Sequence, residues 1–74
     1  MSGAITATDN LRGAARLVIQ PAKEGVYLFV FETASSQTPE QDHLQASLAE
    51  ALAQAAEDFG ASDAWTAWEG PSLV

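Results

Sequence analysis

Val26-Tyr27-Leu28-Phe29-Val30-Phe31-Glu32 is the stretch that decides the fold of this 74-residue chain. Alternate side chains of a β-strand point to opposite faces, so the stretch carries one aliphatic row and one aromatic row. The aliphatic row is Val26, Leu28 and Val30, and the aromatic row is Tyr27, Phe29 and Phe31. Both faces of this strand therefore have to be covered, which is difficult for a chain that allows only one small domain.

The segment before this stretch supplies a partner strand. In residues 14–20 one face of a strand would carry Leu17 and Ile19, and the other would carry Arg16, Val18 and Gln20, a pattern typical of a half-buried strand. Residues 21–25 predict the connecting hairpin loop, because Pro21 favours a turn start and Gly25 can adopt a positive φ. We therefore expect two antiparallel strands, at residues 14–20 and 26–33.

A helix start follows the second strand. Thr38 is a good N-cap, Pro39 suits the first helical position, and Gln41 stands where a capping box needs it. Gly60 can end the helix in the left-handed conformation. We expect one long helix over residues 39–59. Its apolar stripe, at helical spacing, is Leu44, Leu48, Ala51, Leu52, Ala55 and Phe59.

The remainder of the chain predicts one more strand. Residues 64–69 contain Trp65 and Trp68, which stand three positions apart and therefore face opposite sides of a strand. The dipeptide Gly70-Pro71 ends this strand, and residues 70–74 form a tail.

Together these elements predict a single α+β domain with ββαβ order, in which a three-stranded, mainly antiparallel sheet carries one long helix on one face. We favour the strand order 2-1-3; the alternative places the third strand beside the second as a parallel pair. Residues 1–10 are small and polar, so we expect a flexible N-terminal segment, with a short edge strand at residues 4–8 as an option. We expect the aromatic row, with Leu17 and Ile19, beneath the alanine-rich helix; a one-residue slip in register would exchange the two faces.

The composition excludes several classes of function. Ten acidic and three basic side chains give a formal net charge of −7, and no Lys or Arg follows residue 23. Such a surface repels phosphate groups, so we expect no binding to nucleic acid or to an anionic membrane. The chain has no cysteine, which excludes disulfides and thiolate metal sites. Residues 1–10 have no basic region followed by an apolar core, so we expect no signal peptide, and no apolar run reaches about 18 residues; we therefore expect a soluble, cytoplasmic protein.

Candidate catalytic and metal-binding residues are few. His43, the only histidine, lies beside Asp42 and close in sequence to Glu40 and Ser47. These residue types suit acid–base chemistry, but on the predicted helix His43 faces solvent and no cleft is implied. On a helix the neighbouring side chains also diverge too far to share one metal ion. We therefore predict no catalytic residues, no metal, no cofactor and no enzymatic activity.

Protein binding is the class of function that remains. With the aromatic row beneath the helix, the aliphatic row would lie on a helix-free sheet face, and large exposed apolar patches mark interfaces. We predict a small, acidic, non-enzymatic protein-interaction module that acts as a homodimer through this face or binds another protein. The predicted interface residues are Val26, Leu28, Val30, Val18, Trp65 and Trp68.

Two alternatives stay open. The first is a small-molecule-binding or enzymatic protein with a pocket at the subunit interface, lined by Trp65 or Trp68, Tyr27 and carboxylates. The second is an acidic inhibitor or immunity-like regulator of a basic protein, which the net charge favours. The sequence names neither the partner nor the ligand.

Overall fold

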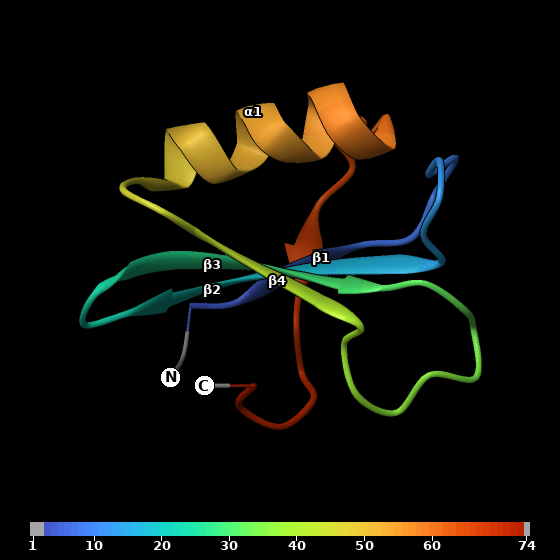
Figure 1. The fold of residues 1–74 in the computed structure, drawn as a ribbon, viewed down its shortest axis with the longest axis horizontal. Coiled ribbons are helices and arrows are strands. Elements are labelled where there is room, and N and C mark those ends of the chain that lie inside the picture. The colour runs from blue at the N-terminus through green and yellow to red at the C-terminus, as the bar shows by residue number, and fades with distance from the viewer. Residues whose placement is uncertain (1–2, 74) are drawn as a thin grey trace.

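The computed structural model describes residues 3–73 as a five-stranded antiparallel sheet with one helix packed on one face (Figure 1). The α+β class predicted from the sequence is therefore confirmed. The elements follow one another as β1 (Ile5–Ala7), β2 (Arg16–Ala22), β3 (Gly25–Phe31), β4 (Gln41–Gln45), α1 (Leu48–Phe59) and β5 (Thr66–Ala67). In the sheet they lie in the order β4-β3-β2-β1-β5, and every neighbouring pair is antiparallel.

The sheet differs in detail from the predicted three strands in order 2-1-3. β1 forms within residues 1–10, for which the sequence predicts a flexible segment, and it lies between β2 and β5 instead of at an edge. The predicted strand at residues 64–69 shortens to β5, which pairs with β1 and not with β2. Of the predicted N-terminal segment and tail, residues 1–2 and 74 lie outside the described part of the chain.

The predicted helix over residues 39–59 is wrong in its first half, which contains β4. β2 satisfies the backbone groups along one edge of β3 only, and the groups along the other edge also need partners. β4 supplies those partners over its whole length, in antiparallel register with residues 26–30. Backbone pairing with the second edge of β3 therefore outweighs the helical sequence pattern of this segment.

The helix that does form is capped at both ends. At its start, the Ser47 hydroxyl accepts a hydrogen bond from the Glu50 backbone N–H (3.2 Å), so a second capping sequence is used in place of the one at Thr38. At its end, Gly60 takes a left-handed φ of 69°, as predicted. The Arg12 guanidinium donates a hydrogen bond to the Glu57 carbonyl (3.1 Å), which places a positive charge at the negative end of the helix dipole.

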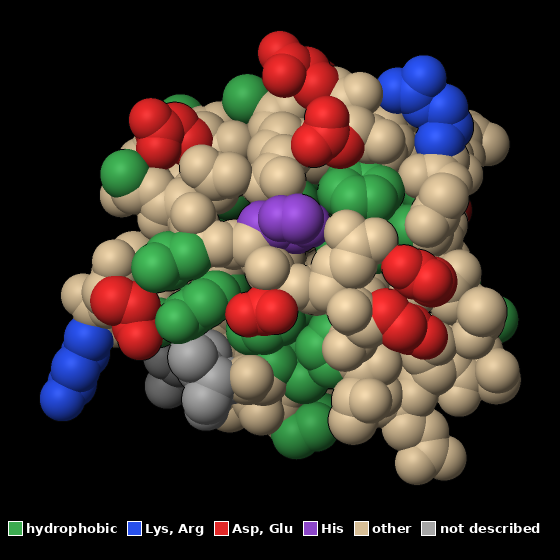
Figure 2. Space-filling model, in the orientation of Figure 1, with side chains coloured by type: hydrophobic (Ala, Val, Ile, Leu, Met, Phe, Trp, Pro, Cys, Tyr) green, Lys and Arg blue, Asp and Glu red, His purple; other side chains and the backbone are tan. Residues whose placement is uncertain are grey.

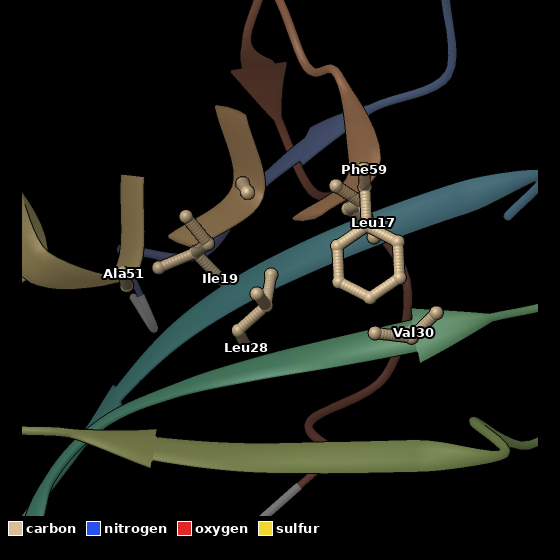
Figure 3. Packing of buried hydrophobic residues seen from close by; sticks show 7 residues of the cluster. Leu17, Ile19, Leu28, Val30, Ala51 and Phe59 are labelled. Atoms are coloured by element: carbon tan, nitrogen blue, oxygen red, sulfur yellow. The ribbon is translucent and has the colours of Figure 1, made fainter. Parts of the chain in front are cut away.

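The helix covers the aliphatic row and not the aromatic row. Leu17 and Ile19 lie beneath it, as predicted, but their partners across the hairpin are Val30 and Leu28. The predicted packing of the aromatic row beneath the helix is therefore wrong. The buried side chains between sheet and helix (Figure 3) are Leu17, Ile19, Leu28, Val30, Ala51, Ala55 and Phe59.

A shorter hairpin turn explains this exchange of faces. The predicted loop at residues 21–25 would have placed Gln20 opposite Val26. In the structure Ala22 lies opposite Gly25, and only two residues connect the strands. The pairing is thereby shifted by one residue, which moves every side chain of β3 to the other face relative to β2.

The aromatic row is covered by the C-terminal segment, which we define as residues 68–73. This segment crosses to the side of the sheet opposite the helix (Figure 1) and packs Trp68 and Leu73 against the row, whose two phenylalanines are each only 5% exposed. The buried Gln20 side chain fastens it by donating to the Ser72 hydroxyl (2.8 Å) and accepting from the Leu73 backbone N–H (3.0 Å). The chain itself therefore closes much of its helix-free face.

Candidate functional site

The six residues predicted as an interface do not form one surface. Leu28 and Val30 of the aliphatic row are fully buried beneath the helix, and Trp65 packs on the same side. Val18, fully buried, and Trp68 belong to the opposite face, so the two tryptophans lie on opposite sides of the sheet, as predicted. An exposed surface for a partner has to be sought elsewhere on the molecule.

The longest open edge of the sheet is β4. Within residues 3–73 no strand pairs with its outer side, and the opposite edge, β5, is only two residues long. In Figure 1 β4 is drawn in front of the other strands. Its side chains alternate between half-buried and exposed positions, and the exposed ones are Asp42 and Leu44. β4 therefore offers five residues of backbone edge with two accessible side chains.

A small apolar surface adjoins this edge on the helix-free face. Leu44 is 49% exposed and lies opposite Tyr27 in the strand register. The Tyr27 ring stacks on Phe29 with 5.4 Å between the ring centroids, which fixes its position. Partial burial, and next the neighbouring Glu24 carboxylate, raise the pKa of the Tyr27 phenol above its ordinary value of 10.0. We call β4 together with Tyr27 the edge surface.

The edge surface is surrounded by negative charge. Glu32 and Glu40 precede β4, Asp42 lies within it, and Glu50 follows it in the first turn of α1. Figure 2 shows this side of the molecule, with acidic side chains spread across it and Lys and Arg side chains only at its margins. A positively charged ligand would therefore meet attraction along the whole edge.

The loop that leads from β3 into β4 is held in place by Glu40. Its carboxylate accepts hydrogen bonds from the Ser36 hydroxyl (2.6 Å) and from the Glu32 backbone N–H (2.9 Å). These two hydrogen bonds hold the pKa of the Glu40 carboxyl below its ordinary value of 4.5. The ionised form of Glu40 is thus the one that orders the loop.

Acidification is expected to release this loop as Glu40 becomes protonated. Because the pKa of Glu40 is lower in the folded than in the unfolded chain, its contribution is complete above about pH 4.5 and disappears as the pH falls through the folded value. Amide NMR spectra recorded from neutral to acidic pH should show the Ser36 and Glu32 signals changing together. In Glu40→Gln both signals should lose that shared transition; an unaltered transition in this variant would assign it to another group.

A cavity of about 310 Å³ lies on the helix-free face, near the end of β3 that is remote from the hairpin turn. Arg16 forms one side of it; its Nη1–H donates to the Thr6 hydroxyl (2.7 Å), and its guanidinium lies over the Trp68 ring, 5.1 Å from the ring centroid. The sequence points to Trp68 but not to Arg16, whose only signal is a basic side chain within an apolar strand. Segments far apart in the sequence build this cavity, and no local pattern predicts it.

Of the residues considered for catalysis, Asp42 and His43 are neighbours on β4, so their side chains point to opposite faces of the sheet. His43 lies on β4 and not on a helix, half-buried, with its Nε2 3.0 Å from the Gln41 side-chain oxygen. Among residues 3–73 no group of three or more His, Cys, Asp or Glu side chains could hold a metal ion.

No helix within residues 3–73 is long and apolar enough to cross a membrane. Comparison of the chain with protein-family models, with curated proteins and with solved structures finds no match in any of the three.

Proposed function

We propose that this protein is a small protein-interaction module whose β4 edge takes up an extended, basic segment of a partner protein as an additional strand. The observation that carries the proposal is the open five-residue edge of β4 bordered by carboxylates. In strand addition, backbone hydrogen bonds supply affinity and alternate side chains supply specificity. Here Asp42 and the flanking glutamates would contact lysine or arginine, and Leu44 with Tyr27 would contact an apolar side chain.

Charge favours a basic partner over a second copy of the chain. Each copy has a net charge of −7, so pairing two β4 edges would bring two sets of carboxylates together. A charged residue on an edge strand, such as Asp42, also opposes self-pairing of sheets. A homodimer through the helix-free face has little apolar surface to bury, because Val18, Phe29 and Phe31 are already covered by the C-terminal segment.

The proposal can be tested with a fluorescein-labelled peptide in which lysine and valine alternate, and with its glutamate–valine counterpart. Fluorescence anisotropy should show saturable binding of the basic peptide only. Asp42→Asn should weaken this binding by about two- to fivefold, as the loss of one exposed ion pair does. Added salt should weaken it further.

Asp9→Asn is the matched control, because it removes the same charge from an exposed position beyond β1, on the far side of the sheet from β4. Equal weakening by Asp9→Asn and Asp42→Asn would show that the peptide responds to net charge alone. Sedimentation equilibrium completes the test. If the chain sediments as a dimer and Leu44→Asp dissociates that dimer, the partner of the β4 edge is a second copy of the chain and not a basic protein.

A further inference from the structure

We propose that the cavity beside Arg16 and Trp68 is a binding site for a small monocarboxylate with a flat apolar body. This site is separate from the edge surface, because it lies at the Phe31 end of the aromatic row, whereas Tyr27 stands at the opposite end. Its walls combine one cationic group, two aromatic rings and a polar rim. The side chains that the assignment uses are Arg16, Phe31, Trp68, Leu73, Thr33 and Ser36.

Arg16 is held in position by two contacts. Its guanidinium has five N–H donors, and among residues 3–73 one of them bonds the Thr6 hydroxyl while the guanidinium plane lies over the Trp68 ring, so that its orientation is fixed. The chain has ten acidic side chains. The two contacts that hold Arg16 within residues 3–73 are nevertheless to a hydroxyl and to an aromatic ring, and not to a carboxylate. A half-buried guanidinium whose contacts within residues 3–73 are a hydroxyl and an aromatic ring is suited to an anionic ligand, and its planar fork matches a carboxylate.

The size and walls of the cavity define the rest of the ligand. A volume of about 310 Å³ is at the lower end for ligand pockets, which limits the ligand to a small molecule such as a single aromatic ring with one substituent. The Phe31 and Trp68 rings are 6.4 Å apart between centroids and inclined at 36°, and they offer an apolar wall beside the guanidinium. The net charge of −7 disfavours multiply charged anions such as phosphate. A single carboxylate on an apolar ring fits all three features.

The C-terminal segment fixes the position of the Trp68 ring in the cavity wall. The Trp68 indole N–H donates to the Pro71 carbonyl (3.0 Å), and Gly70 lies so close beneath the ring that a Cβ there would overlap it. The indole is therefore held both by a hydrogen bond and by contact. Its N–H signal lies at the site and reports on occupation.

Benzoate is the probe that tests the site, and benzyl alcohol is its uncharged counterpart. In NMR titrations of the full chain, benzoate should shift the Trp68 indole and Arg16 side-chain N–H signals with saturation. Benzyl alcohol should bind at least tenfold more weakly, the factor that corresponds to about 1.4 kcal/mol. Inorganic phosphate, titrated in parallel, should bind more weakly than benzoate.

Variants of the two arginines separate the site from general charge effects. Arg16→Gln should weaken benzoate binding at least tenfold and Arg16→Lys by less, whereas Arg12→Gln, at the helix end, should leave it unchanged. Equal binding of benzoate and benzyl alcohol, preference for phosphate, no saturable shift at millimolar benzoate, or full binding by Arg16→Gln would each overturn the proposal. If Arg16→Gln does not fold, the proposal is tested by the benzoate affinity of Arg16→Lys and by the comparison of benzoate with benzyl alcohol on the unmodified chain.

Discussion

Leu28→Asp is expected to leave the chain unfolded at room temperature. Leu28 has no exposed area and is packed in the core formed with Ile19 and the alanines of α1. Removing a leucine from such a core costs about 2 to 5 kcal/mol, and an unpaired buried carboxylate adds to that cost. A domain of this length has roughly 4 to 11 kcal/mol of stability in total. Circular dichroism and amide NMR should show loss of the helix and of the dispersed spectrum.

Leu44→Asp is the matched control for this variant. It makes the same chemical change on the neighbouring strand, at a side chain that is 49% exposed. Its cost should stay below about 0.5 kcal/mol, and the helix should persist. A folded Leu28→Asp variant with an intact helix would place the aliphatic row on an exposed face and would contradict the packing described above.

Gly25→Ala is expected to destabilise the protein by about 2 kcal/mol or more and to detach the end of β4. Gly25 has a φ of 150°, a region that residues with a Cβ rarely adopt. A Cβ at this position would also lie 2.5 Å from the backbone oxygen of Gln45 and 3.1 Å from the Leu44 Cδ1 atom. Both strain and overlap therefore fall where the hairpin turn meets the edge strand. Urea unfolding measures the cost, and amide hydrogen exchange locates it.

Gly13→Ala separates these two causes. Gly13 also has a positive φ, 72°, but a Cβ there would meet nothing within 4 Å. Its cost should be limited to the backbone term of about 1 to 2 kcal/mol, and exchange in β4 should not change. If the two variants cost the same and neither alters β4, the close approach of Gly25 to β4 has no energetic importance.

Those parts of the fold that depend on local signals could be predicted from the sequence. The hairpin follows from two apolar segments and Gly25, and the helix end follows from the periodic stripe and Gly60. The faces of the sheet could not be assigned in the same way. Their assignment depends on a single residue in the length of the turn, and the segment from Pro21 to Gly25 is compatible with a longer loop as well as with two turn residues.

The strand β4 could not be predicted because its sequence also fits a helix. Leu44 and Leu48 continue the apolar stripe of α1 at helical spacing, but they are 49% and 47% exposed and do not belong to the core. Two capping sequences, at Thr38 and Ser47, also compete for the helix start. Only the unpaired edge of β3 distinguishes them, and that is a property of the assembled sheet.

The candidate sites were even less accessible to sequence reasoning. The cavity joins Arg16 of β2 to Trp68 of the C-terminal segment, and neither residue has a local pattern that refers to the other. The edge surface exists because β4 is a strand, so a helical interpretation of that segment hides it. The negative charge follows directly from the composition, but only the fold shows that acidic side chains border an open strand.

The most direct test of the central claim, that β4 is the recognition surface, is an NMR titration of the isotopically labelled chain with the alternating lysine–valine peptide. Amide shifts and protection from hydrogen exchange should concentrate in β4, Gln41–Gln45, with a smaller change at Tyr27. The Trp68 indole signal, at the separate cavity, should not move. Perturbations centred on Trp68 or on α1, with the β4 amides unchanged, would contradict the account.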